Sequence, residues 1–93
     1  MSWSKREDFG YEAFRQEILR RDKKRCQMPG CGSKKRLQVH HIQKYSNSPI
    51  LRTDRQNGIT LCSKCHKQIK NKEKFYIILF TNIVIENENS TRH

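Results

Sequence analysis

The chain has 93 residues, so it forms one small domain at most, and only 33% of them are hydrophobic, which limits the apolar core. Twenty Lys and Arg residues against nine Asp and Glu residues give a formal net charge of +11, which favours a polyanionic partner such as nucleic acid. A solvated basic surface would explain the same composition. The longest apolar stretch, residues 75–85, is too short to cross a bilayer, so nothing indicates a membrane protein.

The N-terminal part of the chain is predicted to contain one helix. Residues 1–10 show little pattern and are expected to be flexible. From residue 11 to about residue 23, apolar side chains recur at helical spacing and predict an amphipathic helix over the core: Tyr11, Phe14, Ile18 and Leu19. Arg20 and Arg21 lie elsewhere on this helix, where they are candidates for contacts with phosphate, although a solvated face explains them equally well.

A turn, a strand and a long connection are predicted next. Pro29-Gly30 favours a tight turn, which lets the two cysteines that flank it point at one ion. Three cations, Lys34, Lys35 and Arg36, then lead into a predicted strand over residues 37–42. Residues 43–56 form a polar connection, and a connection of this length is often functional.

The second half is predicted to continue with a strand and a helix. Asn57-Gly58 favours a tight turn into a short strand at residues 59–61. Ser63 is expected to cap a helix over residues 64–72. The apolar stretch that follows fits either a helix or a strand, and we favour a helix that continues to about residue 80. Residues 86–93 are polar and are expected to be disordered.

Four cysteines predict a structural metal site. They form a Cys-x4-Cys pair and, after thirty further residues, a Cys-x2-Cys pair: Cys26, Cys31, Cys62 and Cys65. The first residues show no apolar segment of a signal peptide, so a reducing cytoplasm is expected, where a metal is favoured over disulfides. This spacing suits tetrahedral zinc, and a closed shell of four thiolates leaves no position for catalysis. The alternative is four free or disulfide-bonded cysteines.

Three histidines lie close to these cysteines in the sequence. Neighbouring strand residues point to opposite faces, so one of His40 and His41 can bind a metal while the other accepts a proton. On a helix, Cys65 and His66 diverge by about 100°, so Cys65 can face the zinc while His66 faces the strands. Each residue also has a simpler explanation, such as a packed core histidine or a histidine beside the zinc. Only the joint pattern indicates a reactive site.

His41, Asn57 and His66, with His40 directly before the first of them and the four cysteines around them, resemble the HNH endonuclease family in its small, zinc-containing phage or prophage type. The nine-residue spacing from Asn57 to His66 agrees with the family pattern, and the resemblance covers residues 11–74. It implies an α+β domain with the ββα-metal fold, also called the HNH or His-Me finger, an N-terminal helix and a zinc site. We expect this nuclease domain to span residues 11–85.

The resemblance also implies a role for each motif residue. His41 would be the general base, and Asn57 would fix the loop around it. His40 and His66 would bind the catalytic divalent ion, with Mg²⁺ or Mn²⁺ expected and Ni²⁺ or Zn²⁺ as further candidates. The implied reaction is hydrolysis of DNA phosphodiester bonds to leave 5′ phosphate and 3′ hydroxyl ends. A neutral imidazole is suited to take the proton of the attacking water.

One position departs from the family pattern. Close relatives commonly have a second histidine four residues after the last motif histidine, where this chain has Lys70, so a third metal ligand is missing. Helical spacing would place Lys70 beside the metal bound by His66. This departure keeps two other interpretations open. One is a non-catalytic zinc module that binds nucleic acid through a degenerate HNH site, and the other is a structural protein in which zinc only stabilises a scaffold.

DNA is the expected partner, held through its phosphate backbone with little sequence specificity. The candidate contacts are all cationic: Arg20, Arg21, Lys34, Lys35, Arg36, Lys67 and Lys70. Phage packaging proteins are further candidate partners, and the expected location is the cytoplasm of a bacterial host. The sequence leaves open whether one or both DNA strands are cut.

Overall fold

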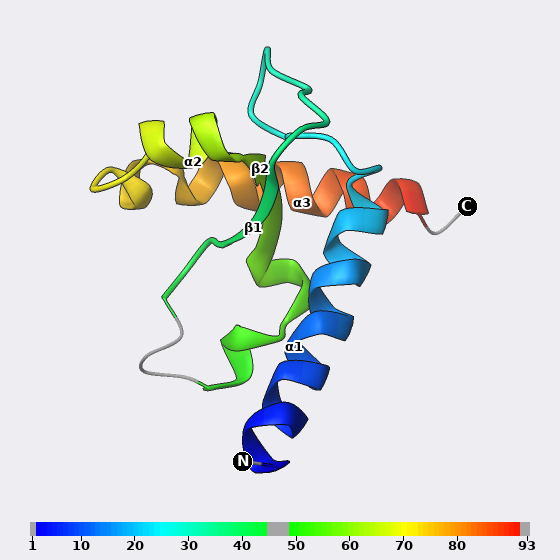
Figure 1. Cartoon of the computed structure of the whole chain (residues 1–93). Coiled ribbons are helices and arrows are strands. Elements are labelled where there is room, and N and C mark those ends of the chain that lie inside the picture. Colours follow the sequence, from blue (N-terminus) through cyan, green and yellow to red (C-terminus); the bar gives the residue numbers. More distant parts are fainter. Residues whose placement is uncertain (1, 45–48, 92–93) are drawn as a thin grey trace.

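The computed structural model describes residues 2–44 and 49–91, with side chains placed for residues 10–44 and 50–90 (Figure 1). Three helices and two strands follow one another along the chain: α1 (Ser2–Arg21), β1 (Leu37–His41), β2 (Gly58–Cys62), α2 (Ser63–Gln68) and α3 (Ile77–Thr91). Three single-turn 3-10 helices occupy Pro49–Arg52, Arg55–Asn57 and Glu73–Tyr76. The predicted small α+β fold with an N-terminal helix is confirmed.

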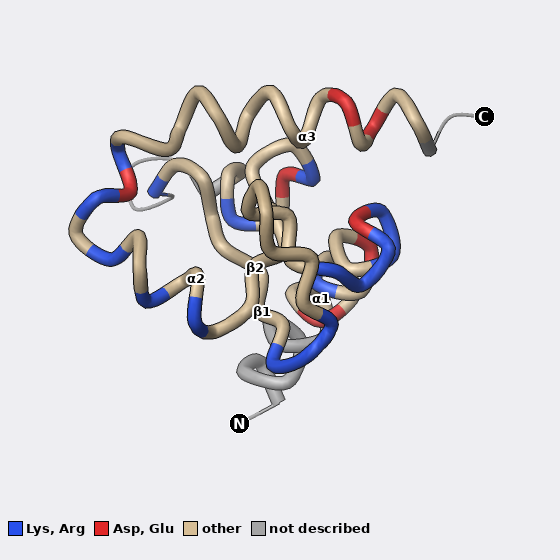
Figure 2. The backbone as a smooth tube through the Cα atoms, turned by 90° about the horizontal axis from the view of Figure 1, so that it is seen from above, with Lys and Arg blue, Asp and Glu red and all other residues tan. Residues whose placement is uncertain are grey.

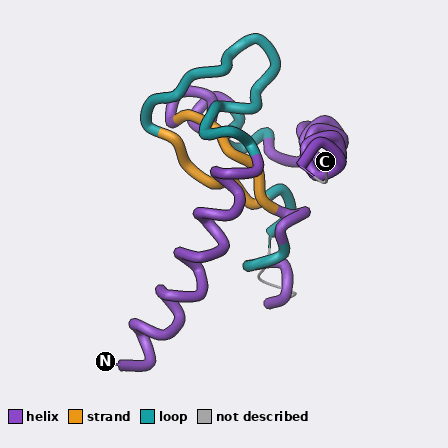
Figure 3. The backbone as a smooth tube through the Cα atoms, turned by 90° about the vertical axis from the view of Figure 1, so that its right-hand side faces the viewer, coloured by secondary structure: helices purple, strands orange, loops and turns teal. Residues whose placement is uncertain are grey.

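The two strands form an antiparallel hairpin at the centre of the molecule. His40 pairs with Ile59, and His41 pairs with Gly58, so the two histidines lie where β1 ends and β2 begins. Figure 3 shows α1 and α3 on different sides of this hairpin. The pleat therefore gives each histidine a different helix as its neighbour, because successive side chains of a strand point to opposite faces.

The core joins one side of each helix to the second strand. Phe14, Ile18 and Leu19 of α1 are buried, as the helical spacing predicted. Every residue of β2 is buried, because helices cover it on both faces. Phe80 and Val84 of α3 complete the core with exposed fractions of 0% and 1%.

Gly58 has a different role from the one that the sequence suggested. Asn57 ends a 3-10 helix and Gly58 is extended, with φ −117°, so the predicted tight turn at Asn57-Gly58 is wrong. A Cβ atom at Gly58 would lie 2.9 Å from Cζ of Phe14 and 3.2 Å from two carbon atoms of Ile18. Glycine is therefore needed here for the close approach of α1 to the hairpin.

The ends of the helices also differ from the prediction. α1 begins at Ser2 rather than at residue 11, so the predicted start of this helix is wrong. α3 continues to Thr91, so the expected disordered tail is wrong within residues 86–91. The flexibility expected for residues 1–10 stays a prediction. Residues 92 and 93 lie outside the described part of the chain. The tail is helical because Val84 packs into the core and the next turn, with Asn87 and Glu88, bonds to the end of α1.

α2 is shorter than predicted and is capped by a different residue. Sγ of Cys62 accepts a hydrogen bond from the backbone N–H of Cys65 at 3.5 Å, so Cys62 rather than Ser63 is the N-cap. The helix ends at Gln68, and the chain then reverses through Asn71, which has a left-handed backbone with φ +68°. Lys70 consequently lies in the turn after α2, and its predicted position on the same helix as His66 is wrong.

A buried ion pair fixes the end of α1. The Arg21 guanidinium donates two hydrogen bonds to the Asp22 carboxylate, at 2.8 and 3.0 Å, and one to the carbonyl oxygen of Gly58 at 2.7 Å. The Asp22 carboxylate also accepts from the backbone N–H of Thr60 and from the Asn87 side chain. The Arg21 side chain is only 1% exposed, so the prediction that it contacts DNA is wrong. The guanidinium is instead bonded inside the protein, where it joins the end of α1 to β2.

Candidate metal centres and active site

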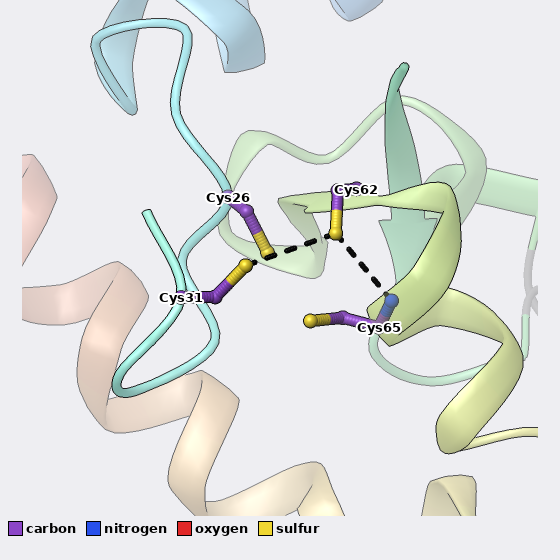
Figure 4. Close-up of side chains that lie close together, drawn as sticks. All are labelled: Cys26, Cys31, Cys62 and Cys65. Atoms are coloured by element: carbon purple, nitrogen blue, oxygen red, sulfur yellow. Dashed lines mark hydrogen bonds between the residues drawn. The ribbon is translucent and has the colours of Figure 1, made fainter. Parts of the chain in front are cut away.

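The four cysteines meet where the chain before β1 crosses the end of β2 (Figure 4). Their four Sγ atoms all lie within 4.8 Å of one another, and those of Cys31 and Cys62 are 3.8 Å apart. Tetrahedral zinc with Zn–S bonds near 2.3 Å places its sulfur ligands about 3.8 Å apart. All four cysteines are free, and a disulfide would need a distance of about 2.05 Å. The predicted four-cysteine cluster is therefore confirmed as a site that can hold a metal ion, and its donor set is consistent with zinc.

A tight turn brings the first two cysteines together. The backbone N–H of Cys31 donates to the carbonyl of Met28 at 2.9 Å, with Pro29 and Gly30 at the centre of the turn. Gly30 has φ +86°, the left-handed conformation that a type II turn requires at this position. The turn predicted from Pro29-Gly30 is confirmed, and it lets Cys26 and Cys31 point toward the same point.

Protonation of the thiols depends on their surroundings. The backbone N–H of Cys65 is the largest influence on Cys62, and it lowers the pKa of this thiol to about 7. Burial raises the pKa of both Cys26 and Cys65. A bound metal ion stabilises all four sulfurs as thiolates, so metal binding at this cluster is coupled to proton release and to folding.

His40 lies on the face of the hairpin that packs against α2 and α3. Its ring is edge-on to the ring of His66, with 5.3 Å between the centroids, and it also contacts Phe80. Burial, more than any other influence, lowers the pKa of His40 to about 4, so the imidazole is neutral at neutral pH and keeps a lone pair. Its Nε2 atom is buried without a hydrogen-bond partner among the described residues.

A buried nitrogen without a partner lowers stability unless another group binds it. The exposed fraction of His40 is 7%, and His66 lies beside it on α2, at the edge of the site. The two imidazoles therefore fit a divalent ion held from one side by His40 and His66. Cys65 precedes His66 directly and faces the cysteine cluster, so the predicted divergence of these two neighbours is also observed.

His41 lies on the opposite face of the hairpin, against α1. Its ring stacks on Phe14 at 5.6 Å and on Tyr11 at 6.1 Å. Its Nε2 atom is 2.8 Å from the carbonyl oxygen of Arg52. A carbonyl oxygen only accepts, so Nε2 carries the hydrogen, and the lone pair of the neutral ring is on Nδ1. The carbonyl and the two aromatic rings thus fix both the tautomer and the direction of this histidine.

Asn57 holds the connection between the two strands. Its side chain accepts from the backbone N–H of Gln43 and donates to the carbonyl oxygens of Gln43 and Leu51, at 2.9 to 3.0 Å. Asn57 is buried, so these bonds are shielded from water. These bonds join Gln43, at the start of the connection, to Leu51 in its middle. They thereby position the next residue, Arg52, whose carbonyl oxygen accepts a hydrogen bond from His41. This arrangement agrees with the loop-fixing role that the resemblance implied.

Tyr11 and Arg52 belong to the surroundings of His41 and were not identified from the sequence. The Arg52 guanidinium lies over the Tyr11 ring at 5.2 Å, so these two residues form a layer beside the histidine. In the sequence Tyr11 was assigned only to the apolar side of a helix. Arg52 lay in a polar connection, and only the length of that connection indicated a function.

The remaining predicted DNA contacts are on the surface. Six of the seven cations are exposed: Arg20, Lys34, Lys35, Arg36, Lys67 and Lys70. Figure 2 shows that Lys and Arg gather on the loops and on α2, whereas none lies on α3. Within residues 2–44 and 49–91, no helix has both the length and the apolar character needed to cross a membrane.

A comparison with protein-family models identifies the HNH endonuclease model, which matches residues 25–72, slightly more than half of the 93-residue chain. The chain belongs to the HNH endonuclease family. The matched segment includes the four cysteines and all four motif residues, His40, His41, Asn57 and His66. Searches of curated proteins and of solved structures found no match. Members of the HNH endonuclease family are generally endonucleases, so the family indicates a nuclease-type function.

Proposed function

We propose that the protein is a metal-dependent endonuclease that hydrolyses DNA phosphodiester bonds with low sequence specificity. The observation that carries the proposal is that two adjacent histidines of β1 lie in different surroundings on opposite faces of the strand. His40 faces a second imidazole with a buried nitrogen that has no partner among the described residues, and His41 is oriented by a carbonyl on the other face. Such an arrangement would separate a metal ligand from a proton acceptor within one strand.

His41 would accept the proton of the attacking water at Nδ1, while the Arg52 carbonyl holds the ring in the required tautomer. His40 and His66 would hold one side of a divalent cation, preferably Mg²⁺ or Mn²⁺, with water and phosphate oxygens as the other ligands. Such a cation supplies positive charge beside the phosphate and the departing 3′ oxygen. The expected ends are 5′ phosphate and 3′ hydroxyl.

The exposed cations would hold the DNA backbone. Residues 34–36 precede β1, and Lys67 and Lys70 lie next to His66 in sequence, so these cations flank the segments that carry the histidines. Contacts between cations and phosphate provide affinity without reading bases.

A plasmid assay tests the proposal. The zinc-loaded protein should convert supercoiled DNA to nicked or linear DNA only when Mg²⁺ or Mn²⁺ is added. His41→Ala should slow cleavage by ~10²–10⁴-fold, the usual contribution of a general base. Zinc content, circular dichroism and DNA affinity should stay close to those of the unchanged protein. Cleavage by a clean His41→Ala preparation at the unchanged rate would remove His41 from the mechanism.

The lack of a histidine at position 70 favours one alternative, a non-catalytic module that binds nucleic acid. Two imidazoles bind a hard cation weakly, and Lys70, exposed in the turn after α2, donates no lone pair as an ammonium. The alternative predicts DNA binding without cleavage at any concentration of Mg²⁺ or Mn²⁺, while a purely structural protein would not bind DNA. A phage or prophage origin, packaging partners and a cytoplasmic location in the host stay predictions.

A further inference from the structure

α3 carries apolar side chains on two opposite sides. On its inner side, Phe80 and Val84 are buried in the core. On its outer side, and on the 3-10 turn that leads into it, four large apolar side chains are exposed: Phe75 (74%), Ile78 (77%), Leu79 (38%) and Ile85 (48%). At about 100° per residue Ile78, Leu79 and Ile85 fall on one stripe of α3, which also includes the exposed polar Asn82, and Phe75 precedes them in the 3-10 turn. The outer side of a surface helix is normally polar, and a helix that is apolar all round is normally covered on all sides.

α3 lacks the positive charge that the rest of the protein carries. The chain has a net charge of +11, yet the sequence of α3 contains no Lys or Arg (Figure 2). Exposed apolar patches of this kind mark sites of protein association. DNA is a poor partner for this surface, because α3 offers no cation to the phosphates and Lys74, over the Phe75 ring at 5.5 Å, lies only at its edge.

We propose that this surface, Phe75, Ile78, Leu79, Ile85 and Glu86, pairs with the same surface of a second copy of the chain. The two α3 helices would run antiparallel about a two-fold axis level with Phe80. Such an interface is self-complementary, since every contact between one residue and another occurs twice, once in each direction. Two chains with a net charge of +11 repel each other. This repulsion is weakest where the surfaces in contact carry no Lys or Arg, as on α3.

Charges at the two ends of the stripe favour antiparallel over parallel pairing of the two α3 helices. Lys74 lies just before the stripe, and exposed Glu86 lies at its far end, so each is six residues from Phe80. Antiparallel pairing therefore places Lys74 of one copy opposite Glu86 of the other, twice per dimer, and Phe75 opposite Ile85. Parallel pairing would place like charges together, which is unfavourable.

The interface is separate from the nuclease residues. The family match ends at residue 72, before the stripe begins, and the stripe faces away from the inner side, where Phe80 contacts His40. Dimer formation thus does not depend on the proposed catalytic activity. A protein that fails to cleave DNA can still show this dimer, and a monomer can still be a nuclease.

Light scattering and sedimentation of the zinc-loaded full chain test the proposal. At ~10–100 µM, the range expected for a small interface, the particle mass should be twice the 11.2 kDa of one chain. Ile78→Arg should give a monomer. Ile50→Arg is the matched control, because Ile50 has the same exposed fraction of 77% but lies in the connection between the strands. It should leave the dimer unchanged, and zinc content should confirm that both variants fold.

A charge exchange tests the antiparallel arrangement. At low salt, Lys74→Glu should weaken the dimer by about tenfold, because each copy then places a glutamate opposite Glu86 of the other. The double variant Lys74→Glu, Glu86→Lys should restore the original affinity. A monomer throughout this concentration range would overturn the proposal. Equal loss of the dimer with Ile50→Arg, or no restoration by the double variant, would overturn it as well.

Discussion

The cysteine cluster and the pair formed by His40 and His66 are neighbours, because Cys65 and His66 are adjacent on α2, but they differ in how completely they can surround an ion. Four thiols approach one point with all sulfur atoms within 4.8 Å, which matches a closed tetrahedral shell. His40 and His66 approach from one side only, with their rings 5.3 Å apart. A closed shell can only stabilise the fold, whereas a half-open one leaves positions for water and for a phosphate oxygen.

Two adjacent residues of α2, Cys65 and His66, belong to different groups of side chains. Cys65 faces the cluster and His66 faces His40, because adjacent helical residues diverge by about 100°. A metal bound by the cluster would therefore also position His66, the neighbour of Cys65. The two groups of side chains are separated by direction rather than by distance, and three substitutions test this separation.

The largest effect is expected from opening the closed shell. Cys62→Ser removes one thiolate and, because metal binding of ~10–16 kcal/mol is coupled to folding, it should leave the domain unfolded. Metal analysis and circular dichroism measure the lost zinc and the lost helix content. A folded Cys62→Ser protein without zinc would show that the cluster does not stabilise the fold. If the unchanged protein lacks zinc and unfolds on reduction, a disulfide explains the cysteines.

A smaller loss should follow from breaking the buried ion pair, which tests whether the zinc cluster alone holds the hairpin on α1. Arg21→Met leaves the buried Asp22 carboxylate without its charge partner and should lower the free energy of unfolding by about 3–5 kcal/mol. Arg20→Met is the matched control, since the neighbouring Arg20 is exposed and should change stability by less than about 0.5 kcal/mol. Urea unfolding of zinc-loaded proteins measures both. Equal effects of the two substitutions would contradict the structural role of Arg21.

The smallest effect is expected at the open site. His66→Ala should weaken Mn²⁺ binding by at least about tenfold, or ~1.4 kcal/mol, while the zinc content and the fold stay unchanged. His41→Ala is the control, because His41 faces α1 and should leave Mn²⁺ affinity unaltered even though cleavage is lost. Calorimetric titration of protein with its cysteine cluster filled gives both affinities. If His41→Ala weakens Mn²⁺ binding as much as His66→Ala does, the two faces of β1 are not separate.

Local rules were sufficient for much of the fold and of the site. Alternation along a strand placed His40 and His41 on opposite faces, and helical spacing identified Phe14, Ile18 and Leu19 as core. The left-handed glycine of a type II turn brought the first two cysteines together. These features depend on the residues themselves and on their immediate neighbours, so sequence reasoning could reach them.

Tertiary contacts decided the rest. Arg21 was predicted to be on the surface, but the neighbouring Asp22 carboxylate and two carbonyl oxygens from distant segments make its burial favourable. Residues 86–91 are helical because Asn87 and Glu88 bond to the end of α1, more than sixty residues away. Arg52 orients His41 through a backbone carbonyl, which no residue type reveals. Residue types and their spacing were enough to identify the candidate metal ligands and the faces they share, because these depend on local geometry. Which charges are buried, and how His41 is held, depends on contacts between distant segments, namely the packing of α1 and α3 on the hairpin.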